Sequence, residues 1–279
     1  MNGQVVEFQD QLKFQYGVAP SIGKHQMETY EYVFGKKAEL FGMNSFLRVK
    51  YLNSRFSYFE VTEISDTQIY ERLHLVDFSF KVVKFLHNQW DVTFSSNPQL
   101  SSNFSDGLGF EDINLGFRVG VSKRWDNSRL DLGLERSTTL GEPKFLPYVQ
   151  YGHRINRLLY AQVGFPHTYF ELTINERHKV TSNTLAHGYY YNITGTGPFT
   201  GVGNDSNTKL SFSCFNFSLE HQYKIQPNIT TVTRIGLLAN NDFNVEDSNG
   251  NPLFTFKTNE SIYFSMGLQF NLNKNNNDQ

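Results

Sequence analysis

The sequence predicts an all-β protein, an antiparallel transmembrane β-barrel of fourteen strands, with twelve strands as the alternative. Three observations predict this class. Apolar and polar residues alternate in many segments, short and long polar breaks tend to alternate between them, and no apolar run reaches the length of a membrane-spanning helix. A period of two is typical of strands. The missing apolar run excludes a transmembrane helix, which needs about 20 apolar residues.

Strands are predicted from residue 12 onward. Apolar side chains take alternate positions in residues 12–18, 76–82, 90–94, 113–121 and 130–134. Within 29–75 the alternation changes phase near Leu52 to Phe56, which we interpret as β-bulges. Within 146–175, Pro166 interrupts a pattern of short strands.

The last strand has the most regular pattern. In SIYFSMGLQFNL (261–272) an apolar residue stands at six consecutive even positions, and Phe254 and Phe256 share that parity. We therefore predict one strand over 253–272, longer than the 9–11 residues that cross a bilayer, with its first half above the membrane. The even face is predicted to contact lipid. Arg should then be harmful at Leu268 and better tolerated at Ser265 or Gln269.

The breaks between strands predict the topology. Short polar breaks lie at 42–45, 87–89, 125–128, 154–157, 175–178 and 226–228, and mostly longer ones at 19–28, 95–110, 194–207 and 240–252. Tight turns at one rim and long loops at the other are typical of outer-membrane barrels. Six turns and both termini at one rim give fourteen strands. Trp90 and Trp125 each lie beside a short break, so both are expected at that rim, with Tyr151 and Tyr223 as further interfacial residues.

Composition bounds the alternatives. Aromatic residues make up 15% of the chain, yet the mean hydropathy is −0.45, a combination that suits a barrel with an apolar outside and a polar inside. We expect a single domain over 1–279, with a short polar tail at 273–279. The start MNGQVVEFQDQ has no signal-peptide pattern, so we expect the mature form of an exported protein. A soluble β-sandwich that binds carbohydrate is the alternative.

A family resemblance supports the membrane interpretation. The chain resembles outer-membrane β-barrel proteins of Bacteroidota, including barrel families of unknown function, over residues 10–272. The segments that carry the resemblance are YFSMGLQFNL at the end of the last strand, RINRLLY (154–160), INERHKV (174–180) and GYYYNITG (188–195). The resemblance implies a barrel inserted in the bacterial outer membrane. The polar tail after Leu272 departs from the family's usual ending beside an aromatic residue.

Chemistry-bearing motifs are not found. The sequence contains no nucleophile elbow, P-loop, zinc-protease motif or Cys-x-x-Cys pair. We therefore predict no catalytic residue, no cofactor, no metal site and no enzymatic activity. The spacing of His167, His178 and His187 matches no metal site. A membrane-embedded hydrolase is kept as an alternative, for which Ser182 and His187 are a candidate pair.

The inward face supplies the candidate functional residues. Strand parity predicts that a set of charged and amide side chains lines the lumen: Arg48, Lys50, Asp77, Lys81, Arg118, Glu135, Glu171, Arg234 and Gln269, with Gln150 and Gln162. Such residues can pair across a barrel or set the selectivity of a water-filled path.

We therefore predict a porin-like channel for small solutes or a scaffold subunit of an envelope complex. Outer-membrane lipid is the expected partner, and other envelope proteins are candidate partners. The net charge of −2 does not favour nucleic acid.

Overall fold

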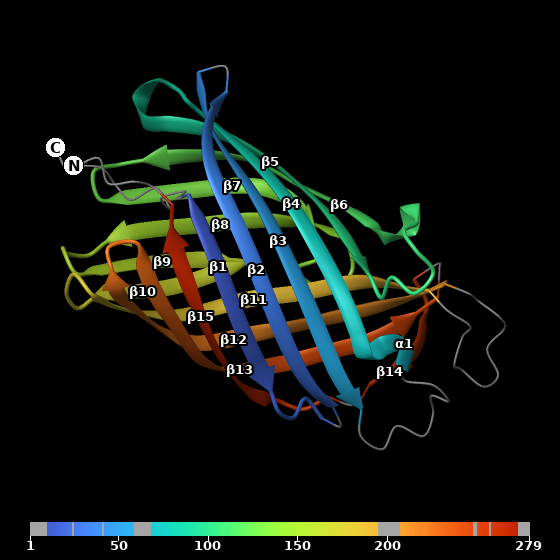
Figure 1. The fold of residues 1–279 in the computed structure, drawn as a ribbon. Helices are drawn as coiled ribbons and strands as arrows, with labels where there is room; N and C mark the ends of the chain where they lie inside the picture. The colour runs from blue at the N-terminus through green and yellow to red at the C-terminus, as the bar shows by residue number, and fades with distance from the viewer. Residues whose placement is uncertain are drawn as a thin grey trace.

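A computed structural model describes residues 10–23, 25–40, 42–58, 68–194, 207–247, 250–256 and 258–272. These residues form one antiparallel sheet that closes on itself (Figure 1). The strands are β1 (Gln11–Ala19), β2 (His25–Leu40), β3 (Met43–Tyr58), β4 (Arg72–Phe85), β5 (Trp90–Ser102), β6 (Ile113–Arg124), β7 (Ser128–Ser137), β8 (Lys144–Arg154), β9 (Leu159–Phe165), β10 (His167–Thr173), β11 (His178–Thr194), β12 (Asn207–Gln226), β13 (Ile229–Glu246), β14 (Pro252–Thr255) and β15 (Ser261–Asn271). Short helical turns are α1 (Gln68–Glu71), η1 (His87–Gln89) and η2 (Phe110–Asp112). Among the described residues, no helix has the length and apolar character to cross a membrane.

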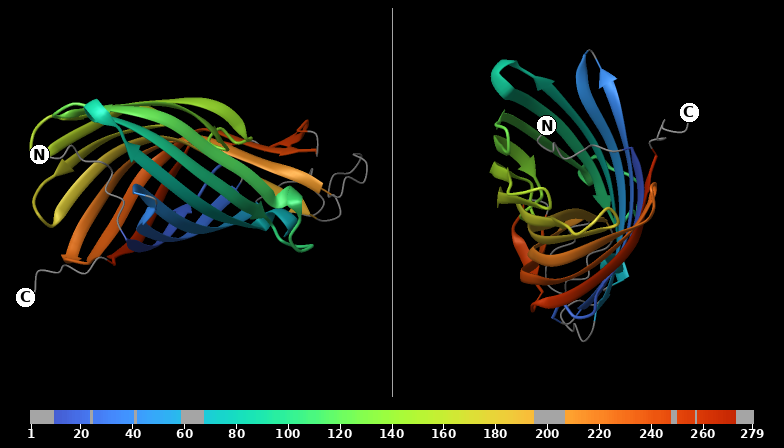
Figure 2. Two further views of the ribbon diagram at one scale, coloured as in Figure 1. Left: turned by 90° about the horizontal axis from the view of Figure 1, so that it is seen from above. Right: turned by 90° about the vertical axis from the view of Figure 1, so that its left-hand side faces the viewer.

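Fourteen strands close the ring, as predicted. Each of β1 to β13 pairs with the next along the chain, β13 pairs with β15, and β15 returns to β1 with Gln11 opposite Asn271. The short β14 pairs only with the end of β13. The twelve-strand alternative is therefore wrong. Figure 2 shows the tilted strands enclosing an elongated interior.

The six predicted short breaks are all turns, and they lie at one rim. That rim, called the turn rim below, also holds the start of β1 and the end of β15. Asn88 in η1 has a φ of 57°, a left-handed conformation that Asn tolerates. Trp90 begins β5 and Trp125 follows β6, so both tryptophans are at the turn rim as predicted.

The opposite rim, called the loop rim, differs from the prediction. β5 continues to Ser102 and β13 to Glu246, so the loops predicted at 95–110 and 240–252 begin later. Pro166 alone connects β9 to β10, where the alternation of turn lengths predicts a longer loop. The strand predicted over 253–272 is two strands, β14 and β15, because β15 stops pairing with β13 at Leu238. Most of the predicted loop 194–207 lies outside the described residues.

The outer face of the ring is apolar. Every strand of the ring except β11 exposes at least one large apolar side chain to the outside: Phe14, Tyr32, Leu47, Phe78, Phe94, Val119, Leu132, Val149, Val163, Phe170, Phe217, Ile235 and Met266. A belt of this kind suits lipid, since exposed apolar surface of such extent is costly in water. Phe264, Met266 and Leu268 of the last strand belong to it, so its even face points outward as predicted.

The phase change near Leu52 is not a bulge. The pairing of β3 with β2 and with β4 runs without a register shift, from Met43 to Tyr58 and from Asn44 to Arg55. What changes is the inner face, which is polar at Arg48 and Lys50 and apolar at Leu52 and Phe56. The bulge interpretation is therefore wrong, because a second apolar surface begins inside the barrel.

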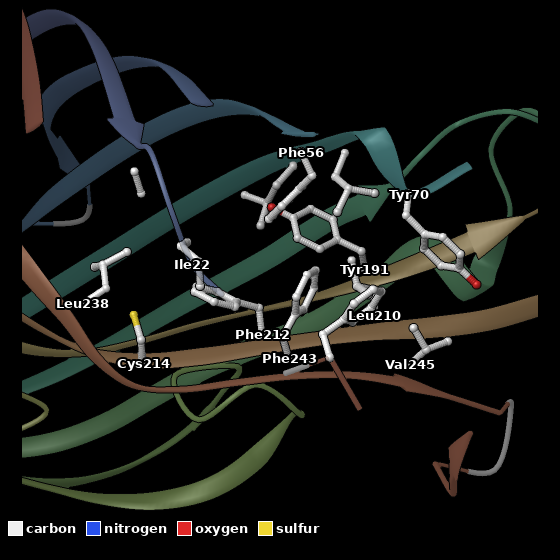
Figure 3. Packing of buried hydrophobic residues seen from close by; sticks show 14 of the residues in the cluster. Ile22, Phe56, Tyr70, Tyr191, Leu210, Phe212, Cys214, Leu238, Phe243 and Val245 are labelled. Carbon is white, nitrogen blue, oxygen red and sulfur yellow. The ribbon is translucent and has the colours of Figure 1, made fainter. Parts of the chain in front are cut away.

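That inner surface is the loop-rim core, a cluster of buried apolar side chains from both sides of the ring (Figure 3). Leu52, Phe56, Tyr191, Phe212 and Phe243 belong to it, and each is at most 5% exposed. The rings of Phe56 and Phe243 stack at 5.3 Å. The core therefore fills the interior at the loop rim with side chains from β3, β11, β12 and β13.

Two connections close over this core. Ile22, in the β1–β2 connection, is 1% exposed and points into it (Figure 3). Tyr70 of α1 is fully buried, and burial raises the pKa of its phenol, so this residue stays neutral inside the core.

β11 comes into contact with β5 near the same level. Its Asn192 pairs with Ser102 of β5, and the Asn103 amide donates to the Asn192 carbonyl at 3.3 Å. Strands β6 to β10 lie between β5 and β11 in the ring. The direct contact of β5 with β11 therefore closes the interior at the loop rim, and β6 to β10 take no part in this closure.

Candidate functional site

A polar cavity lies inside the ring against β3 to β7. Its volume is about 320 Å³, within the range of small-molecule sites. Inward-facing side chains of alternate positions supply most of its wall: Arg48, Asp77, Lys81, Asn97, Arg118 and Glu135. The strand period of two places these groups inside, because their neighbours in sequence are the outward apolar residues.

The first group of contacts surrounds Asp77, which is 3% exposed. Arg48 approaches Asp77 at 3.4 Å and also donates to Ser79 Oγ at 2.9 Å. Gln99 donates to the other carboxylate oxygen at 3.0 Å, and Asn97 donates to Ser79 at 2.6 Å. A buried carboxylate needs such partners, and here several strands provide them.

The second group is the pair of Arg118 and Glu135. Arg118 donates from Nε to Glu135 Oε2 at 2.7 Å, and Glu135 is 2% exposed. The guanidinium also lies 4.5 Å from the centre of the Tyr148 ring, a cation–π contact. That ring fits because β6 and β7 carry facing glycines there, Gly120 opposite Gly133.

A network of charged residues lies on the inner face nearer the turn rim. Asp91 is fully buried and binds Arg124 at 2.6 Å and Arg129 at 3.5 Å. Arg129 also binds Asp131 at 2.8 Å. This network lies beyond the polar cavity along the same strands. Along the strands, the cavity therefore lies between this network and the loop-rim core.

A second, smaller cavity of about 130 Å³ lies near β1, β2, β11, β13 and β15. Its lining includes Glu31, His187 and Arg234 together with apolar residues of the loop-rim core. Glu31 pairs with Lys13 at 3.5 Å, and Arg234 pairs with Glu220, Nε to Oε2, at 3.0 Å. Cations and carboxylates balance in these two pairs.

The structure brings together five of the nine residues predicted to line the lumen. Arg48, Asp77, Lys81, Arg118 and Glu135 line the polar cavity.

The other four predicted residues lie elsewhere along the interior. Arg234 lines the second cavity, and Lys50 lies 5.9 Å from the ring centre of Tyr189. Glu171 pairs with Lys179 at 3.2 Å, and Gln269 donates to Asn271 at 3.2 Å. Contact of any of the nine with a solute stays a prediction.

Several charged residues were missed from the sequence. Asp91 and Asp131 have the inward parity of their strands, so parity alone would have found them. Arg124 and Arg129 flank the β6–β7 turn, outside the alternating segments 113–121 and 130–134. Arg136 has outward parity on β7, and no pattern in the sequence marks it as part of a site.

The candidate hydrolase pair is not assembled. Ser182 lies opposite Phe170, an outward residue, whereas His187 lines the second cavity inside the ring. Among the described residues, no group of three His, Cys, Asp or Glu side chains could hold a metal ion.

Comparison with known proteins places the chain in a family. A family model described as a domain of unknown function, DUF6268, matches residues 44–271. The chain belongs to this family. The DUF6268 match begins at β3 and ends with β15, so it covers most of the ring.

Solved structures that match the chain include two porins and a hydrocarbon channel. The KdgM porin has 7% identity and a TM-score of 0.41, with 94% of this chain and 99% of that one covered. The NanC porin has 11% identity and a TM-score of 0.41, with 94% and 100% covered. The TodX monoaromatic hydrocarbon channel, as a deltaS2 mutant, has 9% identity and a TM-score of 0.42, with 95% and 91% covered.

No curated protein sequence matches the chain. The source organism, the partners and the absence of catalysis therefore stay predictions.

Proposed function

We propose that this protein is a bacterial outer-membrane channel whose polar cavity accepts small anionic solutes. The apolar belt around a closed ring with a polar interior supports the location, since few other environments suit both faces.

The observation that carries the solute class is the charge of the polar cavity. Its lining contains four cationic side chains, Arg48, Lys81, Arg118 and Arg136, and two carboxylates, Asp77 and Glu135. The net charge of this lining is therefore +2. In a narrow space with low-dielectric walls such an excess raises the local concentration of anions.

A scaffold role is the second candidate, and a specific observation favours it. The loop-rim core fills the interior at one end, and the ion network around Asp91 ties β5, β6 and β7 together nearer the other. A barrel filled in this way could serve an envelope complex as a rigid body.

Electrical recording separates the two candidates. The purified protein is inserted in a planar bilayer under a KCl gradient, and conductance and reversal potential are measured. We expect small conductance steps with a preference for Cl⁻. No conductance steps at any voltage would exclude the channel and leave the scaffold role.

A matched pair of variants tests the solute class. Lys81 lines the cavity, whereas Lys84, on the same strand, is exposed outside near the turn rim. Lys81→Gln should shift the reversal potential toward zero, and Lys84→Gln should leave it unchanged. Equal effects of the two substitutions would contradict selection by the cavity.

A further inference from the structure

The polar cavity opens through the wall of the barrel between β6 and β7. The pairing of these strands ends at Phe117 opposite Arg136. Beyond that point Ile113 to Gly116 pair only with β5, and Ser137 pairs with β8. The cavity lining accordingly includes outward residues, Leu115, Phe117 and Arg136, beside inward Arg118 and Glu135. We call this opening the side opening.

The connection after β7 turns away from the wall and so leaves the gap open. Thr138 is 7% exposed, and its hydroxyl donates to Gln99 Oε1 of β5, inside the ring, at 3.5 Å. The same connection packs on Gly188 of β11, where a Cβ atom would lie 2.5 Å from the Gly141 nitrogen and 2.9 Å from the Thr139 carbonyl oxygen. The segment that would extend β7 is therefore folded into the barrel.

The side opening lies at the depth of the membrane. Lys123 of β6 stands opposite Trp90, at the turn rim. Phe117 precedes Lys123 by six residues on β6 and so lies further from the turn rim. Strands that rise about 3.3 Å per residue and tilt by about 40° place it about 15 Å deeper. The apolar band of such barrels is about 25 Å tall, so the opening falls inside it.

The mouth of the opening combines apolar surface with one arginine. Phe117, Arg136 and Phe145 are neighbours across β6, β7 and β8 on the outer face. The two aromatic rings meet edge to face at 5.8 Å, and Leu115 and Phe145 are 61% and 60% exposed. Arg136 donates to the Leu115 carbonyl across the gap. An arginine facing lipid is costly, so its position beside an opening to a net-positive cavity calls for an anionic partner.

We propose that the side opening binds a single-chain amphiphile with an anionic head, drawn from the membrane. Its head would lie between Arg136 and the cavity wall near Arg118, and its tail along Leu115 and Phe145. The proposal rests on the proposed function, for which it supplies both the point of access and the substrate class. It also explains how a solute reaches the cavity although the loop-rim core fills the interior at that rim.

A tryptophan reporter at the mouth tests binding. Phe145→Trp is introduced with Trp90→Phe and Trp125→Phe, so that one tryptophan remains. The folded protein in non-ionic detergent is titrated with brominated dodecanoate, with brominated dodecanol and with a brominated phospholipid. Dodecanoate should quench the fluorescence saturably. The alcohol, which has the same tail, should quench only in proportion to its concentration.

Arg136→Gln, added to this reporter, should raise the half-saturation concentration of dodecanoate by at least about tenfold, as expected for loss of one charge-assisted hydrogen bond. Arg157→Gln is the matched control, since Arg157 is exposed in the β8–β9 turn at the turn rim, away from the side opening. Circular dichroism and heat-modifiable migration show whether each variant is folded. Equal quenching by alcohol and carboxylate, saturable quenching by the phospholipid alone, or no effect of Arg136→Gln in a folded protein would overturn the proposal.

The two proposals fail in distinguishable ways. Conductance with Cl⁻ preference but no saturable quenching would keep the channel and remove the side opening as a binding site. Saturable quenching in a barrel that conducts nothing would keep the binding site and remove the proposed channel.

Discussion

At the scale of single residues, neighbours in the chain face different solvents. Leu268 and Gln269 illustrate this. Leu268 is 40% exposed on the outer face, whereas Gln269 points inward near the turn rim and donates to Asn271. Parity predicted these two directions correctly, because a strand leaves a side chain no third choice.

The same parity did not predict how crowded the inside is. Ser265 is 2% exposed, accepts a hydrogen bond from Gln15 at 2.8 Å and stands opposite Arg234. An arginine at Ser265 would meet a like charge in a filled space. Arg at Ser265 should therefore be destabilising, contrary to the prediction from the sequence.

The first prediction compares the two faces at one level of the last strand. Leu268→Arg should lower the free energy of unfolding, because a guanidinium enters lipid, but by less than the about 2–4 kcal/mol expected at the midplane, since Leu268 lies near the turn rim. Gln269→Arg should change it by less. Urea titration in lipid vesicles measures both, and equal losses would show that the outer face does not contact lipid.

The second prediction concerns the recess that holds Tyr148. An alanine Cβ at Gly120 would lie 2.7 Å from Tyr148 Oη and 2.9 Å from the Leu132 carbonyl oxygen. Gly120→Ala should therefore cost about 1–3 kcal/mol of stability through overpacking. In a Tyr148→Ala background the same change should cost less, which a double-mutant cycle measures. Strict additivity would mean that the ring does not fill this recess.

At the scale of elements, the turn rim could be predicted and the loop rim could not. Six turns rich in Asn, Asp, Ser and Gly are specified locally, because these residues favour tight hairpins. The ends of β5 and β13 depend instead on partners distant in the chain. β5 reaches Ser102 where it meets β11, and β13 reaches Glu246 where β14 pairs with it.

The third prediction tests which rim faces outward in cells. On a Cys214→Ala background, Asn251→Cys near the start of β14 should react with a membrane-impermeant thiol reagent on intact cells. Asn228→Cys, in the β12–β13 turn, should react only after the cells are lysed. Cys214 is buried and 4% exposed, so its removal mainly prevents background labelling. The opposite pattern of labelling would show that the turn rim, and not the loop rim, faces the cell exterior.

At the scale of the whole molecule, the interior of the barrel has two parts. One is polar and charge-paired, and parity revealed most of its residues. The other is the loop-rim core, which the sequence analysis interpreted as irregular strands. Leu52 and Phe56 were visible as a phase change, but a one-strand pattern does not reveal that Phe212 and Phe243 meet them across the ring.

The fourth prediction concerns this core. Phe243 is 1% exposed and contacts the rings of Phe56, Phe212 and Phe256. Phe243→Ala should cost about 3–5 kcal/mol of stability, as a large-to-small change in a packed core does. It should also raise the conductance in a planar bilayer, if the core obstructs the axis.

Phe217→Ala is the control for this change, since Phe217 is 44% exposed on the outer face. It removes the same side-chain volume without opening a cavity. A Phe243→Ala protein that stays folded with unchanged conductance would show that the core does not limit passage.

The contact between β11 and β5 has a consequence for how the fold can change in evolution. Because Asn192 and Ser102 meet directly, the strands that lie between them in the ring, β6 to β10, contribute little to the loop-rim half. Hairpins could be gained or lost in residues 144–173, beyond the β7–β8 connection that packs on Gly188, while the packed end stays intact. Relatives with different numbers of strands could thus share the loop-rim core, while the lining of the polar cavity differs among them.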